Sequence, residues 1–296
     1  MAQFSEQQAI IARRRKEISA RYPQMMTDLI AEWHSPGTQD KAWLLYSANY
    51  LFRTGNVRWA MDPLTLRRRV PDAPAVDLAQ DLAALDFVVL THRHADHLDF
   101  DLLRSLRHLP IRWVIPDYIL PQVQSEAGLP AEQVIAPQPL QPIDIHGIRL
   151  LPFVGLHWEA APSENGPQHG VPEMGYLVEF NNKRWLLPGD TRDFKTELLP
   201  SFGPVDGLFA HLWLGRGCAL MEEPPLLDAF CQFCLALQPK RIYLTHLEEL
   251  GRDAEDYWDG RHSEKVMSRC QQLAPQVPIS AVYMGTSVNL KGGIAF

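Results

Sequence analysis

Residues 87–99 of the chain are FVVLTHRHADHLD, and this stretch decides the fold. Its first four residues form a compact apolar run that predicts a buried strand. The run leads directly into three histidines and an aspartate, which are His92, His94, Asp96 and His97. Packing alone does not explain such a group at the end of a buried strand, so we interpret it as a metal-ligating motif.

The spacing within this motif separates two pairs of ligands. His92 and His94 are two residues apart, so their imidazoles point to the same side of extended backbone and can share one metal. Asp96 and His97 lie in the turn that follows and could serve a neighbouring second metal. Imidazole and carboxylate suit Zn, Fe or Mn, and the absence of cysteine from the motif argues against a closed structural zinc site.

Strands and helices alternate along most of the chain. Residues 4–33 predict one or two amphipathic helices before the main domain. Asn181-Asn182 predicts a tight turn between two strands. Two halves, each rich in strands with helices interspersed, favour two packed sheets flanked by helices. Besides residues 87–90, the main expected strands cover two runs within 42–62, then 112–116, 133–136, 143–156, 175–180, 183–190, 206–212 and 241–246.

The composition excludes several classes of protein. Hydrophobic residues make up 46% of the chain and charged residues 21%, as in ordinary globular proteins. The formal net charge is −7 and the basic residues form no sustained cluster, so a nucleic-acid-binding surface has little support. The chain shows neither an apolar run long enough to span a bilayer nor the layout of a signal peptide. We therefore expect a cytoplasmic protein without a membrane span. The sequence is compatible with an oligomer.

Four features together resemble the metallo-β-lactamase superfamily of metal-dependent hydrolases. They are the HxHxDH pattern of residues 92–97, a later strand-end histidine, the Gly-Asp-Thr of residues 189–191 and a final histidine at His246. The order of THRHADHLD, LHW and PGDT is most similar to the branch of N-acyl-phosphatidylethanolamine phospholipase D enzymes and ascorbate-6-phosphate lactonase-like proteins. The resemblance implies an α/β fold, a four-layer αββα sandwich over residues 39–296, preceded by an N-terminal helical extension over residues 1–38.

The same resemblance implies two divalent metal ions, with zinc favoured and manganese or iron as alternatives. Asp190 matches the carboxylate that bridges them, and the glycine before it permits close approach of the backbone. His246 follows another apolar strand and matches the last ligand of the second site. The implied metal ligands are His92, His94, Asp96, His97, His157, Asp190 and His246.

Two residues compete for the third histidine position of the first metal. His157 ends the predicted strand and matches the His-Trp of the branch named above. His169 precedes Gly175-Tyr176 by a spacing that resembles the tRNA 3′-processing endonucleases. We favour His157, because rigid strand ends place ligands more reproducibly than a loop that holds Pro162, Gly166 and Pro167.

The implied chemistry is the hydrolysis of a small-molecule ester, lactone or phosphodiester. Two cations would share a water whose pKa falls toward neutrality, which supplies hydroxide without a separate strong base. The leaving group would take a proton from Asp190, or from His169 or His211 nearby. The expected catalytic residues are Asp96, Asp190, His169 and His211.

The same metal ligands are compatible with two other functions. The spacing of His169 to Tyr176 favours a tRNA 3′-processing nuclease, against which the acidic net charge stands. With iron, the site could instead serve diiron redox chemistry or ligand binding, since a fold does not determine chemistry. Substrate specificity is expected in the loops 159–174 and 214–225.

Overall fold

The structure is a computed structural model of the 296-residue chain, and it describes residues 2–37, 39–160 and 168–290. The chain divides into two compact units. The first unit comprises Ala9–Pro137 and Val282–Phe296, and the second unit comprises Met1–Gln8 and Gln138–Ala281. Thr38, where we placed the boundary of the N-terminal extension, lies outside the described residues. Within those residues, every helix is too short or too polar to cross a membrane.

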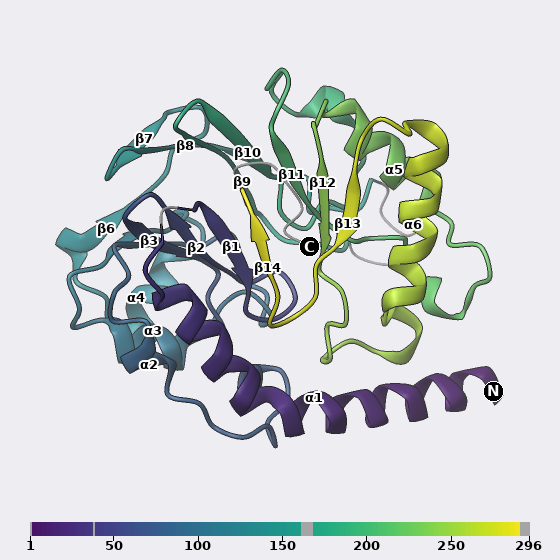
Figure 1. Cartoon of the computed structure of the whole chain (residues 1–296), viewed down its shortest axis with the longest axis horizontal. Coiled ribbons are helices and arrows are strands. Elements are labelled where there is room, and N and C mark those ends of the chain that lie inside the picture. The colour runs from purple at the N-terminus through teal and green to yellow at the C-terminus, as the bar shows by residue number, and fades with distance from the viewer. Residues whose placement is uncertain (1, 38, 161–167, 291–296) are drawn as a thin grey trace. The chain divides into compact units, whose positions relative to one another are not determined.

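The sheet of the first unit is mixed and consists of β1 (Lys41–Leu44), β2 (Tyr50–Thr54), β3 (Val57–Met61), β4 (Phe87–Val89), β5 (Arg112–Val114), β6 (Val134–Ile135) and β14 (Ser287–Asn289). Its order is β14-β1-β2-β3-β4-β5-β6 (Figure 1). The strands from β14 to β3 pair antiparallel, and those from β3 to β6 pair parallel. β4 lies inside the parallel part with all three side chains buried, as its apolar sequence predicts.

The helices of the first unit are held to its sheet by specific polar contacts as well as by apolar packing. They are α1 (Ala2–His34), of which residues from Ala9 onward belong to this unit, α2 (Leu78–Asp81), α3 (Phe100–Leu106) and α4 (Leu120–Ala127), with short η1 (Leu66–Arg68) and η2 (Ala131–Gln133). The buried Trp33 near the end of α1 donates its Nε1–H to Phe52 O in β2 at 3.1 Å. Gly128 ends α4 in a left-handed conformation, which glycine adopts readily.

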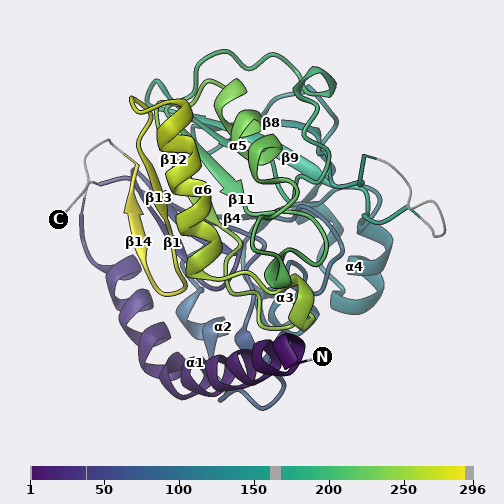
Figure 2. The same cartoon turned by 90° about the vertical axis from the view of Figure 1, so that its right-hand side faces the viewer.

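The sheet of the second unit is also mixed and consists of β7 (Ile143–Ile145), β8 (Ile148–Val154), β9 (Met174–Phe180), β10 (Lys183–Leu187), β11 (Gly207–His211), β12 (Ile242–Thr245) and β13 (Ile279–Ala281). Its order is β13-β12-β11-β10-β9-β8-β7, and the strands from β10 to β13 are parallel. In Figure 2, α5 (Leu227–Ala236) and α6 (Gly260–Leu273) lie over the parallel strands. The short helices are η3 (Thr196–Leu198), η4 (Cys218–Leu220) and η5 (Ala254–Asp256).

The predicted elements agree with these assignments except in three places. The strand expected over residues 143–156 is instead the hairpin of β7 and β8, which turns at His146 and Gly147. Both turn residues have positive φ, 51° and 80°, which is the conformation of a two-residue hairpin turn. The short strands β13 and β14 were not predicted, and β1 is a third strand in the region where we expected two.

Candidate metal centre

The motif of residues 92–97 lies at the carboxyl end of β4 in the first unit. Leu90 donates its backbone N–H to Val114 O at 2.9 Å, and the chain then leaves the sheet. His97 donates its backbone N–H to His94 O at 3.0 Å, which closes a turn within the motif. The side chain of His92, which lies between Leu90 and His97 in the sequence, is buried. The ligand candidates of the first unit are therefore anchored to a central strand rather than to a loose connection.

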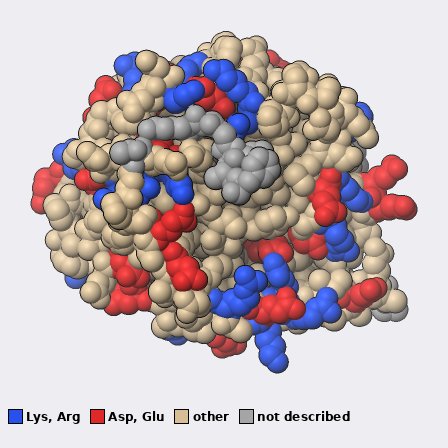
Figure 3. All heavy atoms as spheres, in the orientation of Figure 1, with Lys and Arg blue, Asp and Glu red and all other residues tan. Residues whose placement is uncertain are grey.

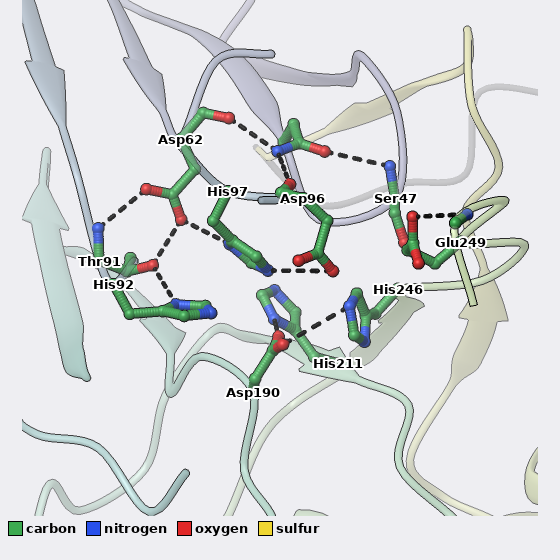
Figure 4. Close-up of polar contacts among 12 residues, drawn as sticks. Ser47, Asp62, Thr91, His92, Asp96, His97, Asp190, His211, His246 and Glu249 are labelled. Atoms are coloured by element: carbon green, nitrogen blue, oxygen red, sulfur yellow. Dashed lines mark hydrogen bonds and ion pairs between the residues drawn. The ribbon is translucent and has the colours of Figure 1, made fainter. Parts of the chain in front are cut away.

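Asp62, which follows the neighbouring strand β3, orients two of these histidines (Figure 4). Its carboxylate accepts hydrogen bonds from the Thr91 backbone N–H at 2.8 Å, the Thr91 hydroxyl at 2.5 Å and His97 Nδ1 at 2.8 Å. Because that hydroxyl gives its hydrogen to Asp62, its oxygen accepts from His92 Nδ1, at 2.9 Å. Each ring then carries its hydrogen on Nδ1, so Nε2 is the atom with the lone pair that a cation needs.

Asn49 joins Asp62 to the backbone of the motif. Its amide Nδ2 donates to Asp62 O at 2.7 Å and to Asp96 O at 2.8 Å. Ligand atoms of Asp62, His92 and His97 lie within 4.8 Å of one another, which agrees with a carboxylate that faces the Nδ1 sides of both rings. Sequence analysis missed Asp62 and Asn49. The signal that could have found Asp62 is its place at the carboxyl end of the strand that pairs in parallel with β4.

Replacing Asp62 with Asn is expected to weaken metal binding by about 10- to 100-fold, the usual effect of losing a partner that orients a ligating histidine. Asn lacks the negative charge and presents an NH₂ group where one of the accepting oxygens stood. Competition with a fluorescent chelator measures the affinity. Asp72→Asn, at an exposed position of the same unit, is the control. Equal affinities of the two variants for metal would contradict this role of Asp62.

Three predicted residues of the second unit follow three neighbouring parallel strands. Asp190 comes after β10, His211 ends β11 and His246 follows β12. The carboxyl ends of parallel strands share one edge of the sheet, so these side chains meet there. His211 Nδ1 donates to Asp190 Oδ1 at 2.7 Å, and His246 Nε2 lies 3.5 Å from Asp190 Oδ2 (Figure 4). All three are buried, which strengthens the electrostatic coupling among them.

Glu173, which sequence analysis missed, links His157 to Asp190 within the second unit. Its Oε1 accepts the backbone N–H of Asp190 at 2.9 Å, and its Oε2 lies 3.9 Å from His157 Nδ1. The carboxylate is buried, and so is His157. Contrary to the prediction, His157 does not end a strand: β8 ends at Val154, and His157 lies three residues beyond it. His157 therefore lies beside Glu173 and outside the sheet.

His246 is also held by an arginine and a tryptophan that sequence analysis missed. Trp258 donates its Nε1–H to His246 O at 2.7 Å, and the Arg252 guanidinium lies over the Trp258 ring at 4.0 Å. Arg252 Nη2 lies 3.1 Å from His246 Nε2. The backbone of His246 has a φ of 63°, a conformation that a non-glycine residue adopts only when its surroundings impose it. These contacts fix the last predicted ligand at the sheet edge.

A second arginine, Arg192, follows Asp190 by two residues. Burial lowers the pKa of its guanidinium below the usual value, the Asp190 carboxylate opposes this, and Arg252 adds to the lowering. An arginine keeps its charge despite such a shift, since its ordinary pKa is far above neutrality. The predicted bridging carboxylate therefore lies near the positive charge of Arg192.

His169, the alternative to His157, is half-buried, and its carbonyl accepts the backbone N–H of Glu159 at 3.0 Å. Of the loop around it, residues 161–167 lie outside the described residues, and these include Pro162, Gly166 and Pro167. The role of His169 as a proton donor stays a prediction, and so does the choice of His157 as the third histidine.

Two mixed sheets with flanking helices, and histidines and acids at the carboxyl ends of their parallel strands, define the metallo-β-lactamase fold. The chain belongs to the family described as the beta-lactamase superfamily domain, whose model matches residues 59–247. The predicted fold class and superfamily are thereby confirmed.

Known proteins similar to this chain include one relative by sequence and several by structure. The relative is a UPF0173 metal-dependent hydrolase from Cupriavidus metallidurans, 29% identical over 172 residues, a match that covers 53% of this chain and 57% of that protein. The chain thus spans little more than half the length of this relative. The structure of Igni18, a metallo hydrolase from Ignicoccus hospitalis, has a TM-score of 0.62 at 16% identity and covers 86% of this chain and 100% of that one. A possible metal-dependent hydrolase from Veillonella parvula has a TM-score of 0.60 at 16% identity, with coverages of 85% and 99%. At these identities the structural likenesses show the fold alone.

Proposed function

We propose that the chain is a metal-dependent hydrolase that binds two divalent cations through its predicted histidine and aspartate ligands. Family membership and the name of the Cupriavidus relative support this proposal. The observation that carries it is the orientation of His92 and His97 by Asp62, which presents two Nε2 lone pairs from one strand end. The proposed metal ligands are His92, His94, Asp96, His97, His157, Asp190 and His246.

The donor set fits zinc and, less selectively, manganese or iron. It consists of imidazoles and carboxylates without a thiolate, which is typical of catalytic sites with open coordination positions. When bound, such cations polarise a substrate oxygen and lower the pKa of a water toward neutrality.

The remaining chemistry belongs to side chains of the second unit. The proposed reaction breaks a C–O or P–O bond of an ester, lactone or phosphodiester, and the departing oxygen must gain a proton. The proposed donor is Asp190 or His211, whose Oδ1 and Nδ1 lie 2.7 Å apart, and the proton that the attacking water loses would replace the one given up. His169 is the alternative donor, and Asp96 is expected to take part in the reaction as well as in metal binding.

The charge of the molecule favours a small-molecule substrate over a nucleic acid. The formal net charge is −7, and on the face shown in Figure 3 Lys and Arg are interspersed with Asp and Glu. A nuclease that follows a phosphate backbone needs a continuous basic surface. The resemblance of the LHW and PGDT segments to phospholipase D-like and lactonase-like enzymes further supports an ester, lactone or phosphodiester.

Removal of the metal tests this function directly. Protein treated with dipicolinate and then desalted is expected to lose turnover of p-nitrophenyl acetate and bis(p-nitrophenyl) phosphate, and added Zn²⁺ is expected to restore it. The loss is expected because the proposed nucleophile is a water whose pKa the bound cations would lower. Turnover that persists in protein shown to be free of metal would refute the proposal.

The identity of the native metal separates the proposed hydrolase from the redox alternative. Elemental analysis of the purified chain should give about two zinc or manganese ions per molecule. Two iron ions per chain, together with failure of zinc to support hydrolysis, would favour diiron chemistry instead.

A further inference from the structure

Two arginines of the second unit hold one carboxylate between them. The Glu159 oxygen Oε1 accepts a hydrogen bond from Arg216 Nη2 at 2.6 Å and lies 3.5 Å from Arg192 Nη1. Arg216 Nε donates to the other oxygen, Oε2, at 3.4 Å. Paired guanidiniums around one carboxylate are a usual means of recognising an oxyanion, because each presents its N–H groups in a fixed plane.

An aromatic ring supports both guanidiniums. The Cζ atoms of Arg192 and Arg216 lie 4.7 and 5.9 Å from the centre of the Trp213 ring, which is itself buried. The side chain of Arg192 is only 12% exposed, whereas that of Arg216 is 45% exposed. Arg192 is thus buried against the Trp213 ring, whereas Arg216 is open to solvent. Such an arrangement admits an anion from outside and holds it on a preformed surface.

Arg192 belongs to the same chain segment as the predicted ligand Asp190. Arg192 follows Asp190 by two residues, and its backbone N–H donates to Leu156 O at 2.7 Å, next to His157. A group bound by these guanidiniums would therefore lie near the carboxylate and imidazole of the second unit.

The Glu159 carboxylate is a weak occupant of this position. Its side chain is 20% exposed, and ion pairs that reach solvent contribute little to stability. Arg216 keeps a further acidic neighbour when Glu159 leaves, since its Nη1 lies 3.7 Å from Asp256 Oδ2. Exchange of Glu159 for another oxyanion would therefore keep the charges of the cluster paired.

We propose that Arg192 and Arg216 bind an anionic group of the substrate, a carboxylate or a phosphate, and that Glu159 occupies this subsite until the substrate displaces it. This inference rests on the proposed hydrolase function and specifies its substrate class as anionic esters, lactones or phosphodiesters. Specificity then resides in the second unit, beside the predicted proton donors.

Anion binding by metal-depleted protein tests the subsite without any contribution from metal ions. Inorganic phosphate and acetate are titrated separately by calorimetry. Glu159→Gln removes the competing carboxylate and is expected to tighten binding of at least one of the two anions by about tenfold or more, whereas Arg216→Gln is expected to weaken it by a similar factor. The anion bound more tightly identifies the preferred group.

A matched pair of controls exists in the same unit. Glu179 also lies between two arginines, with Arg184 Nε at 3.0 Å and Arg149 Nε at 3.5 Å, but within the part of the chain that the structure describes neither guanidinium lies over an aromatic ring. Glu179→Gln and Arg149→Gln should leave the affinity for both anions within twofold of the unaltered chain. If Glu159→Gln gives no gain in affinity for either anion, or if Arg216→Gln binds as tightly as the unaltered chain, the subsite does not exist.

A kinetic measurement ties the subsite to the reaction. With metal restored, Arg216→Gln is expected to lower the ratio of kcat/KM for a carboxylate-bearing nitrophenyl ester to that for its neutral isostere by about tenfold, mainly through KM. An unchanged ratio would remove the subsite from catalysis. If instead the chain binds no metal and hydrolyses neither ester, the proposed function fails while the calorimetric result stands on its own.

Discussion

Asp190→Asn is expected to lower hydrolytic turnover by about a thousandfold and to reduce the metal content of the chain. The substitution replaces a charged carboxylate by a neutral amide, so one proposed cation loses a ligand that could bridge it to the other. It also disrupts the 2.7 Å hydrogen bond from His211 Nδ1, because the amide offers only one acceptor oxygen. The loss of a group that handles protons in the reaction accounts for about 10²- to 10⁴-fold in typical enzymes.

The measurement combines kcat with metal quantification of the same preparation. Asp193→Asn is the matched control, since Asp193 lies three residues away and pairs with Lys195 Nζ at 3.6 Å instead of with a histidine. The control is expected to retain its metal and its turnover within about twofold, since the Asp193 carboxylate contacts Lys195 rather than a predicted ligand. An Asp190→Asn chain with normal turnover and normal metal content would show that the predicted bridging carboxylate has no such role.

The predictable part of the fold came from signals that act over a few residues. The left-handed φ values of Asn181 and Asn182, 49° and 58°, are those that a two-residue hairpin turn requires, and asparagine adopts them at low cost. The apolar run of β4 gave a central strand because a strand in a parallel sheet is buried on both faces. Candidate site residues were found where such a run ended in a histidine, as at His211 and His246.

The residues that sequence analysis missed are defined by contacts between distant segments. Asp62 and Glu173 are single acids with no informative spacing around them, and their roles emerge only when β3 pairs with β4 and when Glu173 meets Asp190. The hairpin at His146 and Gly147 was missed for a different reason. The apolar residues on both sides of this turn continue the alternation of a single strand, so periodicity alone does not reveal the break.

Gly189→Ala should be among the most destabilising single substitutions in the second unit, at about 3 kcal/mol in the free energy of unfolding. Gly189 has a φ of 84°, which costs an alanine about 1 kcal/mol. A Cβ atom there would also lie 2.4 Å from both Cδ and Oε1 of Glu173, and overpacking of this kind costs a further 1–3 kcal/mol, so about 2 kcal/mol is added. Relief of the clash would displace Glu173 and with it the backbone of Asp190, so metal binding should weaken as well.

Gly147→Ala separates the two causes in this experiment. Gly147 has a nearly identical φ of 80°, but a Cβ atom there meets nothing within 4 Å, so only the backbone cost of about 1 kcal/mol is expected. Glu173→Ala removes the atoms that the new methyl group would strike. The double variant Gly189→Ala/Glu173→Ala should therefore be less destabilised than the sum of its single variants by about 1 kcal/mol or more in chemical denaturation. Two results would contradict this: strictly additive free energies of unfolding, or equal losses of stability in Gly189→Ala and Gly147→Ala. Either result would mean that the buried Glu173 carboxylate does not crowd the Gly189 backbone. Glu173 could then not be what positions Asp190.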